Sequence, residues 1–153
     1  MSSIDRGQKS LKLSLMCLTI GLSACAGSPP ENLGIQDNKL APCPSSPNCV
    51  SSYETSADHK VSPWSYKGNS ADAQNKLLSI LKSKDNVKVV SEQNGYVRAE
   101  FESSLMGFVD DVEFVITNAE VHMRSASRLG YSDLGANKKR IDGLAAEFNP
   151  CCE

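Results

Sequence analysis

Asp111-Val-Glu-Phe-Val-Ile-Thr117 and Glu120-Val-His-Met-Arg-Ser-Ala126, with Asn118-Ala119 between them, are the stretch of sequence that decides the fold. Apolar and polar residues alternate on both sides of this turn, which predicts two antiparallel β-strands joined as a hairpin. Pairing Thr117 with Glu120 gathers the large apolar side chains on one face, which becomes the core face. The predicted cross-strand partners are then Ile116 with Val121, Phe114 with Met123, Glu113 with Arg124, and Val115 with His122.

A second hairpin is predicted upstream, where residues 87–92 meet residues 96–101. A two-residue Asn94-Gly95 turn would place Val89 opposite Glu100, whereas a three-residue loop with Gly95 left-handed keeps one face apolar. We therefore predict the three-residue loop, which sets Val87, Val89 and Ser91 opposite Phe101, Ala99 and Val97.

Helical periodicity flanks the two hairpins. Residues 70–83 carry one apolar stripe and can be capped by Asn69 or Ser70, and residues 136–148 carry another. The inward residues are Ala73, Leu77, Ile80 and Leu81 in the first helix, and Ile141, Leu144, Ala145 and Phe148 in the second. The predicted fold class is α+β: a four-stranded antiparallel sheet of two hairpins, with a helix before and after it and an extended N-terminal arm.

Residues 1–24 have the three parts of a secretory signal: a basic start, an apolar run over 13–22 and small residues before Cys25. The run is too short for a membrane-spanning helix, which takes about 20 residues. Leu22-Ser23-Ala24-Cys25 resembles the lipobox of bacterial lipoproteins, which implies cleavage before Cys25, diacylglycerol on its sulfur and a further acyl chain such as palmitate. The expected location is the bacterial cell envelope, at the outer membrane facing the periplasm, because Ala26 follows the cysteine. An ordinary signal peptide with a chance cysteine is the alternative.

Without the signal the chain has 129 residues, enough for one domain. We divide the sequence into a signal peptide (1–24), a flexible tether (25–41), a domain (42–148) and a cysteine-containing tail (149–153). The mature chain has 13 basic and 17 acidic residues, a net charge of −4 that argues against nucleic acid as a partner.

The remaining cysteines are expected to meet an oxidising compartment. Cys43 and Cys49 enclose a loop rich in turn formers and are predicted to form a disulfide. Cys151 and Cys152 are left free, oxidised together or bonded to another chain, and pairing of the loop cysteines with the tail stays open. We predict no metal site and no cofactor, because the sequence has neither a Cys-x-x-Cys pair nor a Gly-rich phosphate loop.

Three motifs in order are typical of a known family. They are Cys-Pro-Ser-Ser-Pro-Asn-Cys-Val-Ser-Ser at 43–52, Gly-Phe-Val-Asp-Asp-Val-Glu-Phe at 107–114, and Arg-Ser-Ala-Ser-Arg-Leu-Gly-Tyr-Ser-Asp-Leu-Gly at 124–135, continued by Asn137, Arg140 and Ile141. Over about residues 42–148 the chain resembles a family catalogued as a domain of unknown function, number 1499. The resemblance implies a protein of bacterial envelopes or plant plastids without an established activity.

The charged residues of these motifs allow three interpretations. In the first, they form a structural ion network in which Glu113 pairs with Arg124, and Arg128 or Arg140 neutralises Asp110 and Asp111.

In the second interpretation, Asn137 caps the last helix. The basic residues of its first turn oppose the helix dipole, so they are expected to bind an anion together with the helix amides. The ligand would be a phosphate or carboxylate of a lipid head group or an envelope glycan. The candidate residues are Arg124, Arg128, Tyr131, Asn137, Lys138 and Arg140.

The third interpretation is an enzyme in which Asp111 and Glu113, which share a strand face, perform acid–base or cation-dependent hydrolysis of an envelope polymer. Asp110 points to the opposite face, and no Gly-x-Ser-x-Gly motif is present. The function expected from the sequence is a non-catalytic, membrane-anchored module that binds an anionic ligand or an envelope protein. The alternative is the hydrolase or cation-dependent enzyme.

Overall fold

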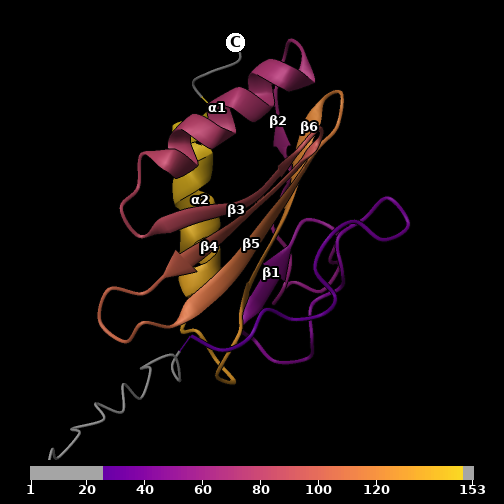
Figure 1. Cartoon of the computed structure of the whole chain (residues 1–153). Helices are drawn as coiled ribbons and strands as arrows, with labels where there is room; N and C mark the ends of the chain where they lie inside the picture. The colour runs from indigo at the N-terminus through magenta and orange to yellow at the C-terminus, as the bar shows by residue number, and fades with distance from the viewer. Residues whose placement is uncertain (1–25, 150–153) are drawn as a thin grey trace, which may run out of the picture.

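The two predicted hairpins form the centre of one antiparallel sheet (Figure 1). The structure is a computed structural model, and it describes residues 26–149. The hairpin strands are β3 (Val87–Gln93) with β4 (Tyr96–Glu102), and β5 (Val109–Ile116) with β6 (Glu120–Ser127). The order of the main strands is β1-β6-β5-β4-β3.

The prediction of four strands is wrong, because the chain before α1 (residues 26–69), which we call the arm, extends the sheet. β1 (Cys49–Ser51) and β2 (Trp64–Ser65) both pair antiparallel with β6, which gives a six-stranded sheet. These strands are three and two residues long, too short for an alternating pattern to reveal them. The outer edge of β6 is thereby covered by backbone from the arm.

Helices α1 (Ser70–Lys82) and α2 (Ala136–Phe148) pack on one face of the sheet, as Figure 1 shows. Asn69 caps α1, because its side-chain oxygen accepts a hydrogen bond from the backbone N–H of Asp72 at 2.8 Å. Both helices have the predicted positions. Their buried stripes meet Val97, Phe114 and Met123 of the sheet in one core, where full burial of such a side chain contributes about 1.5–3 kcal/mol.

The register of the β5–β6 hairpin is confirmed. All the predicted partners pair, and the backbone N–H of Thr117 donates to Glu120 O at 2.9 Å.

The β3–β4 hairpin combines both turn alternatives. Val87 and Val89 lie opposite Phe101 and Ala99 as predicted, but the register shifts after Val89. As a result Ser91 lies opposite Arg98 and not Val97, and the connection is the two-residue Asn94-Gly95 turn. A bulge at Val90 adds one residue to β3, so the favoured turn and the apolar pairs coexist.

The arm covers the second face of the sheet. Leu40 is buried against Tyr96 and Val115, and Gly34 donates its backbone N–H to Glu113 at 2.7 Å. In Figure 1 the arm runs beside β1 and β6, on the side of the sheet away from the helices. Gly34 and Leu40, which the sequence analysis assigned to a tether over 25–41, thus pack on the sheet and supply partners to buried groups.

Cys43 and Cys49 form the predicted disulfide, with their Cα atoms 5.6 Å apart. Cys25, Cys151 and Cys152 lie outside the described residues. Across residues 26–149, no helix combines the length and the apolar character needed to cross a membrane.

Candidate functional site

The candidate site lies on the arm face of the sheet. Alternate residues of β4, β5 and β6 point to this face, because side chains alternate along a strand. Together with Arg128, which directly follows β6, they form a charged network of three cations and three anions: Arg98, Arg124, Arg128, Glu100, Asp111 and Glu113. The charges cancel, and most of these groups are shielded from solvent by one another and by the arm.

Asp111 is the centre of this charged network and is 1% exposed. One carboxylate oxygen accepts from Arg98 Nη2 at 2.9 Å, and the other accepts from Arg128 Nε at 2.8 Å. Arg128 also donates to Glu100. The hydrogen bond to Asp111 raises the pKa of Arg128 above its ordinary value, although burial acts in the opposite direction. Asp111 is held between two arginines and is poorly placed to act as a base.

Glu113 is fully buried, and its carboxylate is also occupied. Oε1 accepts from Gly34 N at 2.7 Å and from Tyr96 Oη at 2.9 Å, and Oε2 faces Arg124 Nη1 at 3.4 Å. Burial, followed by the charge and hydrogen bond of Glu113, raises the pKa of Tyr96 well above its ordinary value. Tyr96 therefore stays protonated and donates to Glu113.

Arg124 is the least satisfied member of the charged network. It is 3% exposed, and its 3.4 Å contact with Glu113 is long for a charge-assisted hydrogen bond. Its Nε–H is buried and has no hydrogen-bond partner among the described residues. A buried unsatisfied donor costs about 1–3 kcal/mol and calls for an explanation.

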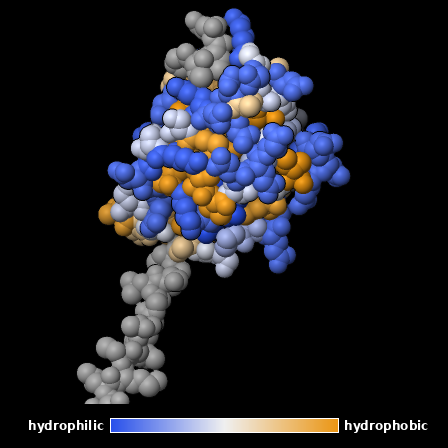
Figure 2. All heavy atoms as spheres, turned by 45° about the horizontal axis from the view of Figure 1, so that its top comes forward, coloured by the Kyte–Doolittle hydropathy of each residue, from blue (hydrophilic) through white to orange (hydrophobic). Residues whose placement is uncertain are grey.

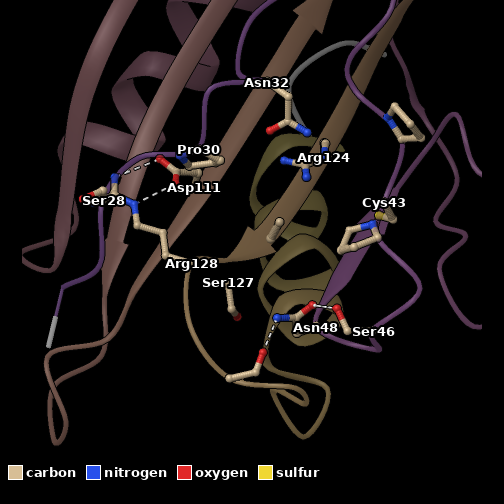
Figure 3. A pocket seen from close by; sticks show the side chains of 14 residues that line it. Ser28, Pro30, Asn32, Cys43, Ser46, Asn48, Asp111, Arg124, Ser127 and Arg128 are labelled. Carbon is tan, nitrogen blue, oxygen red and sulfur yellow. Dashed lines mark hydrogen bonds and ion pairs between the residues drawn. The ribbon is translucent and has the colours of Figure 1, made fainter.

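Arg124 lines a pocket of about 550 Å³ between the arm and β6 (Figure 3). Its walls carry hydroxyl, amide and proline side chains, chiefly Ser28, Pro30, Asn32, Pro42, Pro44, Ser46 and Asn48. In Figure 3, the side chains of Asn32 and Arg124 both border the pocket. The wall is fixed by the disulfide and by Asn48, which donates to Gly130 O at 2.7 Å.

The first turn of α2 differs from the prediction. Gly135, with a φ of 82°, is the cap residue, and Asn137 is a buried residue inside the helix. The N–H groups of Gly135 and Asn137 donate to the carboxylate of Asp133 at 2.9 and 2.8 Å. The chain's own Asp133 therefore occupies the helix amides that were expected to bind an anion.

The six predicted ligand-binding residues are divided between three places. Arg140 pairs with Asp110 and donates to Ser125 on the helix face, where Asn137 also bonds to Ser125. Arg124 and Arg128 lie on the arm face. Tyr131 and Lys138 lie at the surface, where Lys138 pairs with Asp142. Adjacent strand residues such as Arg124 and Ser125 point to opposite faces, so closeness in sequence does not bring them together.

The structural ion network is confirmed in its pairs. Glu113 faces Arg124, Arg128 neutralises Asp111, and Arg140 neutralises Asp110 on the opposite face. Arg98 and Glu100 were not among the predicted site residues, although their alternation with Val97 and Ala99 is a usable signal. Gly34 and Asn32 also contribute to the site, and no sequence pattern predicts them.

One family model matches the chain. It is described as Protein of unknown function (DUF1499) and covers residues 39–148. No curated protein and no solved structure matches the chain. The matched range includes the sheet, both helices and the disulfide loop, and it begins after Ser28, Pro30 and Asn32 of the pocket wall.

Proposed function

The chain belongs to the family Protein of unknown function (DUF1499), whose description states no activity. We propose that it is a membrane-anchored binding module of the bacterial envelope. The domain binds the anionic group of an envelope molecule at Arg124 and performs no chemistry on it. The anchor is lipid on Cys25, as the lipobox-like sequence suggests.

The buried, unpartnered Nε–H of Arg124 carries this proposal. A guanidinium presents its donors in a planar fork that matches a carboxylate or a phosphate. Arg124 lines the pocket, and a small turn of its head group would bring the enclosed Nε–H to an anion bound there and supply the missing hydrogen bond. Arg124 is removed from water when the protein folds, so ligand binding does not have to desolvate it again.

The walls of the pocket indicate what carries the anionic group. A volume of about 550 Å³ suits a small ligand. Hydroxyl and amide groups can bond to sugar hydroxyls or peptide groups, and prolines offer rigid apolar contacts. An acidic glycan fragment and a lipid phosphate share the required chemistry, so an experiment must separate these two sources.

The hydrolase alternative receives no support from this geometry. Asp111 and Glu113 each accept hydrogen bonds from two or more groups, so neither offers a free carboxylate to a substrate. Arg98 holds the carboxylate of Asp111 in a fixed orientation, and Tyr96 does the same for Glu113.

A binding measurement tests the proposal. We expect N-acetylmuramic acid, as the carboxylate probe, or glycerol phosphate, as the phosphate probe, to raise the melting temperature of the wild-type protein. Asn32→Leu narrows the pocket at an exposed position and should abolish that rise without loss of stability. Lys138→Ala, outside the pocket, is the matched control and should keep it. Equal loss in both variants, or no rise with either probe, would contradict the proposed site.

The anchor is tested separately. In a bacterial host, Cys25→Ser should abolish incorporation of labelled palmitate, whereas Cys17→Ser within the signal should leave it intact. Incorporation that persists in Cys25→Ser would contradict the anchor and leave the Arg124 site untouched.

A further inference from the structure

One end of the molecule exposes large apolar side chains. Two loops carry six of them: Leu105, Met106 and Phe108 between β4 and β5, and Leu129, Tyr131 and Leu134 between β6 and α2. Leu105 is 91% exposed and Leu134 is 97% exposed. We call these six residues the apolar end. Side chains of this size in two neighbouring loops indicate a surface that contacts something apolar.

The two loops lie side by side. Leu105, Met106, Phe108 and Leu129 line one shared hollow of about 280 Å³. The β4–β5 loop is held in shape, because Ser103 N donates to Phe108 O at 2.8 Å and Phe108 N donates to Ser103 Oγ at 2.9 Å. Figure 1 shows both loops at the end of the sheet away from the C-terminus. The apolar end is therefore a shaped surface with contributions from both loops.

The described chain begins at this same end. Gly27 accepts a hydrogen bond from Arg128 Nη1 at 3.3 Å, and its backbone has a φ of 66°. A Cβ at Gly27 would lie 3.0 Å from Arg128 and 3.1 Å from Leu129, so the backbone here touches the β6–α2 loop. Figure 2 shows hydrophobic side chains spread among hydrophilic ones on the visible face, with some at the edge near the start of the described chain.

The distance along the chain from Gly27 to Cys25 is short. Two residues span at most about 7 Å. A lipid on Cys25 would therefore enter the bilayer next to Leu129, and the other exposed apolar side chains would meet the same interface.

We propose that the apolar end is a membrane-docking surface that inserts into the bilayer holding the Cys25 lipid. Apolar side chains at an interface reach roughly 5–10 Å into the boundary between head groups and acyl chains. Because the two loops and the lipid anchor all contact the bilayer, the domain has a fixed orientation relative to the membrane. Ser28 and Gly130 of the pocket wall adjoin this end, so the Arg124 pocket lies near the level of the head groups. The inference rests on the membrane anchor of the proposed function.

Depth-dependent quenching tests the docking surface on the full, lipid-modified protein. The vesicles contain phosphatidylethanolamine, phosphatidylglycerol and a phosphatidylcholine brominated along its acyl chains. The probe variant is Leu105→Trp, and the matched control is Val90→Trp, another exposed apolar position, on β3. The native Trp64 is buried in the core and gives the background emission.

We expect the added tryptophan at position 105 to lose about half of its emission in brominated vesicles, because it lies at the interface. The tryptophan at position 90 should keep its emission. Equal quenching at both positions, or none at either in protein that sediments with the vesicles, overturns the docking surface and leaves the anchor standing. Protein that does not sediment with the vesicles at all overturns both.

Discussion

The two faces of the sheet are built from the same strands and are held by opposite means. On β5, Val112 and Phe114 point to an apolar core closed by two helices, while Asp111 and Glu113 point to the charged network closed by the arm. The helix face gains most of its stability from apolar burial, which has no preferred direction. The arm face depends on exact pairing, because each buried charge needs a partner. A buried charged group that lacks a hydrogen-bond partner, such as Arg124, therefore points to a ligand. A small void in the apolar core would not.

The largest expected effect is on the apolar face. Phe114→Ala should lower the free energy of unfolding by about 3–5 kcal/mol, because it removes a fully buried ring and leaves a cavity. Urea denaturation followed by far-ultraviolet circular dichroism measures the change. A loss below about 1 kcal/mol would mean that this face is not the main core.

The next effect is on the arm face. Asp111→Asn keeps the shape but removes the buried charge between Arg98 and Arg128 and leaves Glu100 as their one shared anion in the described network, so unfolding should become easier by about 3 kcal/mol. The matched control is Glu92→Gln, which breaks the exposed pair with Lys82 and should cost no more than about 1 kcal/mol. Similar losses in the two variants would show that the arm does not bury the charged network.

The smallest effect concerns Tyr96. Tyr96→Phe removes one of the hydrogen bonds to the buried Glu113 and should cost about 2 kcal/mol at neutral pH. Burial and Glu113 raise the folded pKa of Tyr96 above the unfolded value of 10.0. The unfolded chain therefore loses the phenolic proton first, and stability falls as the pH rises above about 10.

Denaturation curves at neutral and alkaline pH measure how much the free energy of unfolding falls as the pH rises. In Tyr96→Phe the alkaline loss of stability should shrink. Part of it should remain, because burial also raises the pKa of Tyr53. The same slope in the wild type and the variant would contradict the Tyr96–Glu113 contact.

The two faces also differ in how far the sequence predicts them. Phe114, Met123, Ile141 and Phe148 follow periods of two and of 3.6 residues, and these periods correctly placed the core, both helices and the β5–β6 register. The charged network was predicted only in its cross-strand and loop pairs. Its burial depends on Gly34 and Leu40 of the arm, which pack through backbone contacts that leave no periodic signal.

The same limit explains the misplaced ligand site. Arg140 and Asn137 follow Arg124 and Arg128 closely in sequence, yet the sheet separates them. Asp133 supplies the carboxylate that the basic helix start was expected to take from a ligand. A sequence pattern shows which charges lie near one another along the chain but not which of them lacks a partner in the fold.

The most direct measurement follows the side-chain Nε–H of Arg124 by nuclear magnetic resonance during a titration with glycerol phosphate or N-acetylmuramic acid. We expect a saturable shift of the Arg124 signal. We expect no shift of the Arg140 Nε–H, because Arg140 pairs with Asp110 on the opposite face of the sheet. An Arg124 signal that stays fixed while the probes bind elsewhere, or equal shifts of both arginines, would contradict the claim that Arg124 is the anion-binding group.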